Sequence, residues 1–415
     1  MNCKLRTNRI ISLILIIFLC ITSYGCQKKN SAGESKDKAL NVYVDVKDKN
    51  SLNIIKFLTE EYKKENPKSK IKVNDVLGTD GNIEQDISKG TEADVVITNR
   101  NTMMELARKG LISDMGQYYE KNKIGDKFYN VVSSYGRIRE KYYGIGLLPY
   151  TMEIFYNTDA LSKLGVIQPT SIKDMEAVIK KFTASNIKIP IVIGEDLDIN
   201  TALSSVAASN IIKVSDLDNI YDNKEEYKNK KEMQGIFDGL NLAAKYLSIN
   251  KNLFELGNES TFTSLTNGSI PLVISTSYYY SQLKEGKIGV VEDYSVLNNQ
   301  KGTVPVIINS IISIPSNGKN SEEAGKLVKF ILDEKTQEKL VKKGFITGSK
   351  KSNEKLSGIG ASIEKHLLSS SDNNIVYIYS LPKKFKGPIS SKVDNILSGK
   401  YTGSEWQDIV NEVYK

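Results

Sequence analysis

The chain has 415 residues, a formal net charge of +8 and a single histidine, His366. Lysines and acidic residues are interspersed, and no dense basic block with aromatic residues between them occurs, which argues against nucleic-acid binding. One histidine excludes zinc sites built from several histidines and disfavours a Ser-His-Asp or Cys-His catalyst. The composition therefore favours a binding protein over an enzyme, and it calls for no cofactor and no metal.

The first 25 residues are organised like a secretory signal peptide. Three basic residues precede a mostly aliphatic run at 10–21, which is shorter than the roughly 20 residues that a membrane-spanning helix needs. The run leads into Ser23 to Cys26 (SYGC), which resembles the lipobox of bacterial lipoproteins. That resemblance implies cleavage before Cys26 and a diacylglycerol on its thiol, since two acyl chains give stable anchoring. An uncleaved N-terminal membrane anchor is the alternative.

The segment that follows predicts a tether. Residues 26–38 are polar and charged and lack apolar periodicity, which is typical of disorder. The other cysteines, Cys3 and Cys20, precede Cys26, so a chain that starts there holds one thiol and no disulfide. We therefore expect secretion through the Sec pathway and lipid anchoring on the outer face of the cell membrane.

After the tether, short strands alternate with helices. Strands are predicted at 39–45, 71–77 and 94–98, and helices at 51–66, 82–90 and 102–110. Pro67 ends the first helix, and glycines end the other two. This β-α-β-α-β order predicts a parallel sheet with helices on both faces.

A second series of the same kind begins after Gly146. Strands are predicted at 153–157, 189–194 and 270–275, with an apolar strand pair within 304–315, and helices at 158–165, 171–183, 236–247 and 320–343. Ser171 with Asp174 resembles a capping box, and Asn320 with Glu323 marks the start of the last helix. About 375 ordered residues exceed what one core comfortably holds, so two lobes are expected.

Five stretches resemble the extracellular solute-binding proteins of family 1, the group similar to maltose-binding protein that serves ABC importers. They are 57–73 (FLTEEYKKENPKSKIKV), 90–114 (GTEADVVITNRNTMMELARKGLISD), 143–165 (YGIGLLPYTMEIFYNTDALSKLG), 265–280 (LTNGSIPLVISTSYYY) and 312–344. They follow the family's order over nearly the whole chain after the tether. The resemblance implies an α/β, two-lobed fold of the type II periplasmic-binding-protein kind. Each lobe would be a mainly parallel sheet flanked by helices, and hinge strands would join the two.

The resemblance also implies a division of the chain and a function. It places 39–147 with 304–348 in lobe one, and 148–303 with 349–415 in lobe two. The monomeric protein would capture a small solute, first of all a carbohydrate, by hinge closure and deliver it to the transmembrane subunits of an ABC permease. Two alternatives stay open. One is a ligand-sensing lipoprotein for a membrane receptor kinase, and the other is a binder of peptide, polyamine or ferric iron.

Two tyrosines are the first candidates for the ligand site. A sugar has apolar faces and polar edges, so its binder needs flat aromatic rings with hydrogen-bonding groups around them. Tyr278 and Tyr280 follow the strand at 270–275, where the family usually places a stacking tryptophan. The alternative is that these tyrosines begin a packed helix.

The other candidates lie where strands should reach the crevice of an open α/β fold. Tyr150 and Glu153 open the first strand after the expected hinge, Asn99 and Arg100 follow the strand at 94–98, and Asp45 ends the first strand. The guanidinium of Arg100 suits a carboxylate or a pair of hydroxyls. A surface or helix-paired carboxylate is the alternative for Glu153, and a charged turn is the alternative for Asp45.

Overall fold

The structure, a computed structural model, describes residues 39–75, 83–90, 92–194, 196–209, 211–283, 287–294 and 304–415. The expected signal peptide, the tether and Cys26 lie outside these residues. In the described ranges, no helix has the length and apolar character needed to cross a bilayer. Leu40–Lys415 packs as one unit that contains two large β-sheets.

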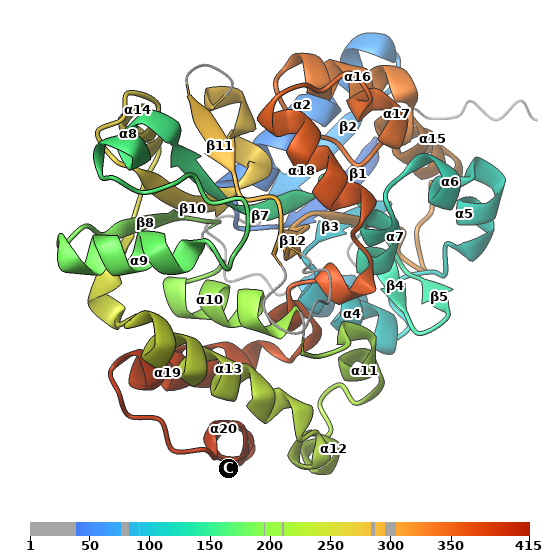
Figure 1. Cartoon of the computed structure of the whole chain (residues 1–415). Helices are drawn as coiled ribbons and strands as arrows, with labels where there is room; N and C mark the ends of the chain where they lie inside the picture. The colour runs from blue at the N-terminus through green and yellow to red at the C-terminus, as the bar shows by residue number, and fades with distance from the viewer. Residues whose placement is uncertain are drawn as a thin grey trace, which may run out of the picture. The chain divides into compact units, whose positions relative to one another are not determined.

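The first sheet gathers strands from distant parts of the chain in the order β2-β1-β3-β13-β6. Figure 1 labels β2, β1 and β3 of this sheet. β1 (Leu40–Asp45) pairs in parallel with β2 (Ile71–Asp75) on one side and with β3 (Val95–Thr98) on the other. β13 (Ile311–Ser313) lies antiparallel between β3 and β6 (Ile145–Gly146). β3 and β13 are buried along their whole length, as expected for a sheet covered on both faces.

Helices from two parts of the chain belong to this sheet. α2 (Lys49–Glu65) buries Ile54, Leu58 and Tyr62 at helical spacing, and α15 (Ser321–Leu332) packs against it. The other elements are α3 (Ile83–Ser88), α4 (Arg100–Arg108), α5 (Gly116–Asn122), α6 (Ile124–Lys127), α7 (Asn130–Gly136), β4 (Arg137–Ile138), β5 (Lys141–Tyr142), α16 (Glu334–Lys342) and α17 (Lys350–Asn353).

The second sheet has the order β11-β7-β10-β8-β9. β7 (Tyr150–Asn157) runs antiparallel to β10 (Leu272–Thr276) and to β11 (Ile288–Val290). β10 pairs in parallel with β8 (Ile189–Val192), which pairs in parallel with β9 (Phe254–Leu256). Among the described strands, β7 is the one that runs antiparallel to the others in the second sheet, and β13 is the one that does so in the first sheet. The expected α/β fold with two mainly parallel sheets is confirmed.

Two short segments carry the chain between the sheets, and they lie side by side. Residues 147–149 link β6 to β7, and residues 308–310 link β12 (Val306–Ile307) to β13. We call them the crossing segments. The Leu147 amide donates to the Ser310 carbonyl oxygen over 2.9 Å, and β12 pairs antiparallel with the start of β7. The antiparallel strand of each sheet is thus the first strand after a crossing segment.

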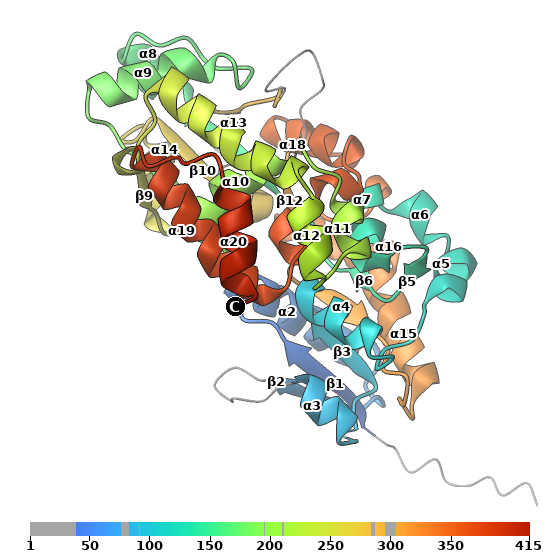
Figure 2. The ribbon, with the colours of Figure 1, turned by 90° about the horizontal axis from the view of Figure 1, so that it is seen from below.

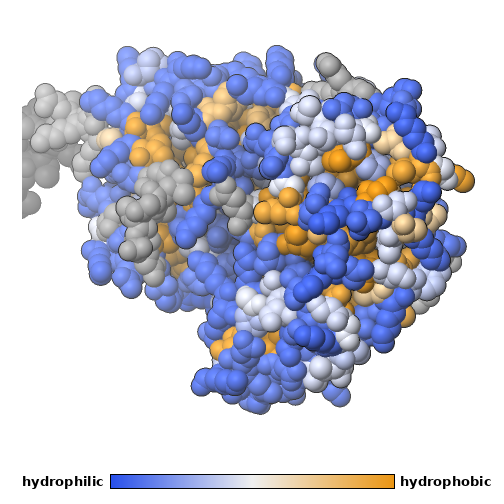
Figure 3. Space-filling view, turned by 90° about the vertical axis from the view of Figure 1, so that its left-hand side faces the viewer, coloured by the Kyte–Doolittle hydropathy of each residue, from blue (hydrophilic) through white to orange (hydrophobic). Residues whose placement is uncertain are grey.

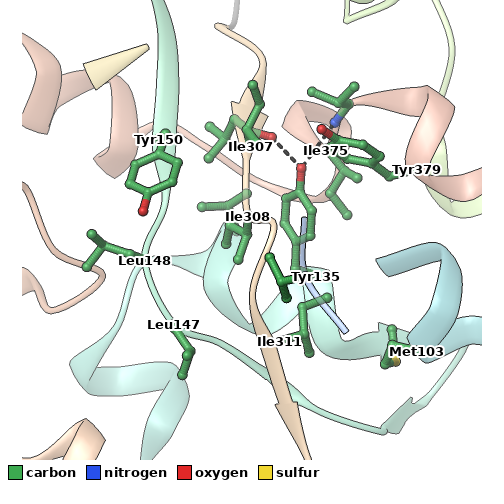
Figure 4. Close-up of a cluster of buried hydrophobic side chains, with 14 of the residues drawn as sticks. Met103, Tyr135, Leu147, Leu148, Tyr150, Ile307, Ile308, Ile311, Ile375 and Tyr379 are labelled. Carbon is green, nitrogen blue, oxygen red and sulfur yellow. Dashed lines mark hydrogen bonds between the residues drawn. The ribbon is translucent and has the colours of Figure 1, made fainter. Parts of the chain in front are cut away.

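The crossing segments run through a cluster of buried side chains (Figure 4). Leu147 and Ile308 are at most 2% exposed. The Tyr135 hydroxyl, on α7, donates to the Val306 carbonyl oxygen over 2.5 Å and accepts from the Val376 amide over 3.4 Å. This tyrosine therefore ties β12, which precedes the second crossing segment, to α7 and to Val376.

Helices also accompany the second sheet. α10 (Ile199–Ala208), α13 (Glu232–Leu247) and α19 (Lys386–Leu397) pack on one another, and α20 (Glu405–Val413) packs on α13 and α19 (Figure 2). The other helices are α8 (Thr158–Lys163), α9 (Met175–Ala184), α11 (Val214–Asn219), α12 (Lys224–Asn229), α14 (Ser260–Thr266) and α18 (Ile359–Leu368), with short 3-10 turns η1 (Lys251–Leu253), η2 (Ser277–Gln282), η3 (Asp372–Asn374), η4 (Tyr377–Ser380) and η5 (Lys383–Phe385).

On the face that Figure 3 shows, the surface is largely hydrophilic, and apolar side chains lie in separate patches. Exposed large apolar residues are spread over several elements, and the most exposed are Ile167, Leu256 and Tyr246. Scattered apolar residues of this kind are ordinary on a folded protein.

The predicted strands at 39–45, 94–98, 189–194 and 270–275 are confirmed to within two residues. The single predicted helix at 320–343 is wrong. Asp333 adopts an extended conformation between α15 and α16, and its side chain accepts from the Lys335 amide over 3.1 Å, so it caps the second helix. Asn320 makes no side-chain cap. Gly344 ends α16 with a φ of 92°, as predicted for a glycine stop.

Two further element starts differ from the prediction. β7 begins at Tyr150, three residues earlier than expected. The helix predicted at 171–183 begins only at Met175. Asp174 accepts from the amides of Thr170 and Ser171 over 3.0 and 2.9 Å. Ser171 to Asp174 therefore form a turn that precedes the helix, and they are not the first turn of the helix itself.

Candidate functional site

Polar groups from three separate segments meet around Gly194, which follows β8. A Cβ atom on Gly194 would lie 3.0 Å from Asp196 Oδ1, 3.2 Å from Asp48 Oδ1 and 3.5 Å from Asn309 Nδ2. Asp48 precedes α2 beside the first sheet, Gly194 and Asp196 follow β8 of the second sheet, and Asn309 lies in a crossing segment. We call these four residues the carboxylate cluster. It lies where both sheets and the connection between them come together.

Asp48 is placed by the start of α2. Its Oδ2 accepts from the Ser51 amide over 2.9 Å and from the Ser51 hydroxyl over 2.7 Å, which makes Asp48 the N-cap of the helix. The side chain is 4% exposed, and the helix N-terminus favours its negative charge. The cap engages Oδ2, so Oδ1 is the oxygen that faces the cluster.

Asp196 is held by neutral donors. Its Oδ1 accepts from Asn309 Nδ2 over 3.0 Å, and its Oδ2 accepts from the Tyr379 hydroxyl. Burial raises the pKa of Asp196, and the Asp48 charge raises it further, while the Tyr379 hydrogen bond acts in the opposite direction. The Lys386 ammonium donates to the backbone carbonyl oxygen of Asp196.

Three tyrosines extend the site from the carboxylate cluster. The rings of Tyr150 and Tyr278 meet edge to face with centroids 5.5 Å apart, and Tyr278 meets Tyr279 in the same way at 5.0 Å. Burial raises the pKa of Tyr150, and the nearby Asp48 charge adds to this rise. Asn50, in the first turn of α2, donates to the Tyr279 hydroxyl over 3.4 Å. The aromatic group from the second sheet therefore touches the helix start that carries Asp48.

Two buried polar atoms at the site have no hydrogen-bond partner: the Tyr150 hydroxyl and Asn309 Oδ1. The Ser51 hydroxyl near Tyr150 acts to lower the pKa of the phenol, but it donates to Asp48 and makes no regular hydrogen bond with the phenol. Tyr150 is 4% and Asn309 3% exposed. A buried polar group without a partner costs about 1–3 kcal/mol. A bound solute that supplies the missing partners would remove that cost.

Of the residues predicted from the sequence, the structure brings Tyr150 and Tyr278 together at this site. Asp45 lies nearby in the chain, half-buried at the end of β1 and opposite Thr98. Asn99 caps α4 by accepting from the Thr102 amide over 3.0 Å. Asp45 ends β1 and Asn99 follows the end of β3, as the sequence predicts.

Arg100 and Tyr280 are engaged elsewhere. Arg100 is 1% exposed, forms an ion pair with Asp218 at 2.6 Å and donates to Ser380 Oγ over 3.1 Å. Its remaining donors reach the backbone carbonyl oxygens of residues 134, 135 and 137. The Tyr280 ring lies against Gly360 at the start of α18, where an added Cβ would be 2.6 Å from the hydroxyl oxygen. Arg100 therefore links α4 to α11 and η4, and its burial at 1% exposure keeps it away from a ligand.

Glu153 is fully buried and pairs with the single histidine. Its Oε1 lies 2.9 Å from His366 Nδ1, its Oε2 accepts from the Tyr294 hydroxyl over 3.2 Å, and His366 Nε2 lies 3.0 Å from the Glu292 carbonyl oxygen. Burial disfavours the charged imidazole, but Glu153 and the Glu292 carbonyl outweigh it and raise the pKa of His366. The pair joins β7 to α18, which explains why both polar side chains are buried.

Sequence reasoning left out Gly194, Asp196, Asn309 and Tyr379. Two of them carry a local signal. Asn309 lies in a mostly apolar run at 304–315, and Gly194 follows the carboxyl end of a buried strand. Asp48 is the helix cap that follows the first strand, three residues after the predicted Asp45. Tyr379 lies in a short 3-10 turn far along the chain and has no such signal.

Two sheets joined by paired crossings, with partnerless polar atoms and aromatic rings between them, define a binding protein for a small solute. Among the described residues, no group of three or more His, Cys, Asp or Glu side chains is placed to hold a metal ion. The family profile of the bacterial extracellular solute-binding proteins matches residues 49–338. The chain belongs to this family and is a solute-binding protein, not an enzyme.

Solved structures agree with this fold. The sugar-binding protein MalE of Xanthomonas citri superposes with a TM-score of 0.69 and 13% identity, covering 91% of this chain and 96% of its own. A chitin oligosaccharide binding protein gives 0.66 and 14%, covering 91% and 98%. An ABC substrate-binding protein of Listeria monocytogenes, in complex with cycloalternan, gives 0.60 and 17%, covering 90% and 97%. No curated protein is similar enough in sequence to count as a match.

Proposed function

We propose that this chain is the substrate-binding lipoprotein of an ABC importer and captures a small carbohydrate. The chemistry of the site supports this class of solute. Tyr278 offers a half-buried aromatic ring for the apolar face of a sugar, and Asp48, Asp196 and Asn309 offer acceptors for its polar edge. The three structural neighbours named above bind, by their titles, a sugar, chitin oligosaccharide and cycloalternan.

One observation carries the proposal: the buried Tyr150 hydroxyl, whose ring contacts the half-buried ring of Tyr278, lacks a partner, and so does the buried Asn309 Oδ1 in the second crossing segment. Both atoms lie at the meeting point of the two sheets. A sugar hydroxyl both donates and accepts a hydrogen bond, so a single sugar ring can serve a phenol and an amide oxygen together.

Capture would proceed by closure of two lobes, 39–147 with 304–348 and 148–303 with 349–415. The paired crossing segments would act as the hinge, since few backbone positions there need to change. Solute that touches residues of both lobes binds the closed state more tightly, and this difference in affinity drives the closure. The permease would then recognise the closed conformation.

The N-terminal segment supplies the location. Cleavage before Cys26 and lipidation of its thiol would hold a monomeric protein on the outer face of the membrane, where the transmembrane subunits of the permease reside. Labelling with a radioactive or clickable fatty acid tests this step, because Cys26→Ser should abolish the label.

Thermal unfolding of the purified full chain tests the solute class. Neutral mono- and oligosaccharides, short peptides, polyamines and ferric salts are added in turn, and a sugar is expected to raise the melting temperature by mass action. Tyr278→Ala should weaken the binding of that sugar about tenfold or more, because the stacking surface is lost. Tyr246→Ala, at an exposed tyrosine on α13, is the matched control. Stabilisation by peptide or iron alone would refute the carbohydrate proposal.

A further inference from the structure

We propose that Phe345 is a second aromatic contact for the solute, which stacks on the apolar wall that this ring forms together with Tyr278. The inference rests on the proposed carbohydrate function and adds a specificity-determining residue to the same site. It follows from the position in which the end of α16 holds Phe345, from the angle at which the two rings meet and from the sheet to which each ring belongs.

The end of α16 fixes the position of Phe345. The Gly344 amide donates to the Val341 carbonyl oxygen over 2.9 Å. The Phe345 amide donates to the Leu340 carbonyl oxygen over 3.1 Å, and with a φ of 92° at Gly344 the two bonds form a Schellman motif. The same turn approaches η2, since a Cβ on Gly344 would lie 2.5 Å from the Ser281 Cβ. The helix end therefore holds Phe345 beside the turn that carries the tyrosines of the site.

The rings of Phe345 and Tyr278 meet at an open angle. Their centroids are 5.6 Å apart, and their planes are inclined by 40°. Tyr278 meets Tyr150 and Tyr279 edge to face, at 86° and 84°, so of these three contacts the one with Phe345 is nearest to parallel. Both rings of the pair are half-buried. The pair therefore forms one continuous apolar wall in which each ring keeps part of its surface exposed.

This wall lies beside the polar groups that the proposed function uses. Burial raises the pKa of Tyr278, and the Asp48 charge acts in the same direction, while Asn53 acts in the opposite one, so the phenol lies close to that carboxylate. The Tyr150 ring, whose hydroxyl lacks a partner, touches Tyr278 directly. A sugar held by its polar edge at these groups can lay an apolar face on the wall, and Phe345 is the ring that extends the wall beyond Tyr278.

The two rings belong to different sheets. Phe345 follows α16, which packs on α15, and α15 packs on α2 beside the first sheet. Tyr278 lies in η2, directly after β10 of the second sheet. In the closure proposed above, a solute favours the closed state only through contacts that differ between the two states. Asp48 supplies a polar contact on the side of the first sheet, and Phe345 adds an apolar one, so the closed state selects for a solute with an apolar face.

Isothermal titration of the purified full chain tests this role with neutral sugars, namely glucose, maltotriose, cellotriose and N-acetylchitotriose together with any sugar that raises the melting temperature. Phe345→Leu keeps an apolar side chain without the ring, and it should weaken the binding of the sugar that the wild type binds about fivefold or more. Phe345→Tyr keeps the ring and should bind that sugar as the wild type does. Phe254→Leu is the matched control, because Phe254 is also half-buried but pairs with Ile189 at the start of β8, whereas Gly194 follows the end of that strand.

Fluorescence separates stacking from a purely structural role of Phe345. The chain has a single tryptophan, Trp406, which is 2% exposed and donates from Nε1 to the Tyr227 carbonyl oxygen. Its emission should therefore change little when the wild type binds a sugar. In Phe345→Trp, the same sugar should change the emission of the added indole and protect it from quenching by acrylamide.

The outcomes distinguish this inference from the proposed function. If a sugar binds the wild type and Phe345→Leu equally well, or if Phe345→Leu and Phe254→Leu lose affinity to the same extent, the role of Phe345 is overturned and the carbohydrate function stands. An added indole that stays accessible to acrylamide with the sugar bound also overturns that role alone. If no sugar binds the wild type, the carbohydrate function is overturned and the inference with it.

Discussion

Replacing Arg100 by methionine is expected to destabilise the fold strongly without weakening solute binding. The guanidinium is 1% exposed, and its hydrogen bonds all go to protein atoms, among them a 2.6 Å ion pair with Asp218. The substitution leaves the Asp218 carboxylate, which is 5% exposed, without its partner. Breaking a buried pair in this way costs about 3–5 kcal/mol, and the lost links to carbonyl oxygens act in the same direction.

Urea unfolding followed by circular dichroism measures this loss, with Arg108→Met as the control at an exposed arginine on α4. The control should change the free energy of unfolding by less than about 1 kcal/mol. Solute affinity of folded Arg100→Met should stay within about twofold of the wild type. A small loss of stability together with a large loss of affinity would refute the structural role and return Arg100 to the ligand site.

Other predictions concern single contacts. The pKa of His366 is raised above its ordinary 6.5, so its pairing with Glu153 stabilises the fold fully below pH 6.5, and this stabilisation is lost as the pH rises through the pKa of the folded state. The difference in free energy of unfolding between the wild type and His366→Gln, measured by urea titration, should therefore shrink from pH 6 to pH 9. A constant difference contradicts this. Gly344→Ala should lower the free energy of unfolding by about 1 kcal/mol or more, because φ at this position is 92° and the Ser281 side chain lies 2.5 Å from the added Cβ. An unchanged denaturation midpoint contradicts this. Asp333→Ala should cost about 1 kcal/mol in the same assay through loss of the α16 cap, whereas Asp333→Asn should be nearly neutral.

The strands were predictable because their signal is local. Runs such as Val95–Thr98 and Leu272–Thr276 are apolar, short and bounded by turn residues, and burial on both faces demands that pattern. The break at Asp333 was harder to predict, because an aspartate is tolerated inside a helix and its capping role emerges only once α16 turns away from α15. The sequence prediction also lacks α18, α19 and α20. Their apolar residues are interspersed with polar ones, and α19 and α20 pack against other helices, whereas α18 packs against β7 and β11.

The site was predictable only in part for a related reason. Tyr278 follows the end of β10 and Tyr150 begins β7, so a rule about the ends and starts of strands finds them. Glu153 satisfies the same rule, yet it is bonded to His366, which is 213 positions away in the chain. Asp196 and Asn309 meet only because one crossing segment passes beside the loop after β8. Contacts between distant segments decide which polar residues are structural and which remain available for a ligand.

The central claim is that two lobes close over a solute at the paired crossing segments. Small-angle X-ray scattering of the purified full chain, with and without a saturating sugar identified by the thermal screen, tests it most directly. The account predicts a smaller radius of gyration in the presence of the sugar, and no such change for a variant that cannot bind it. Superimposable scattering curves with the sugar bound would contradict closure.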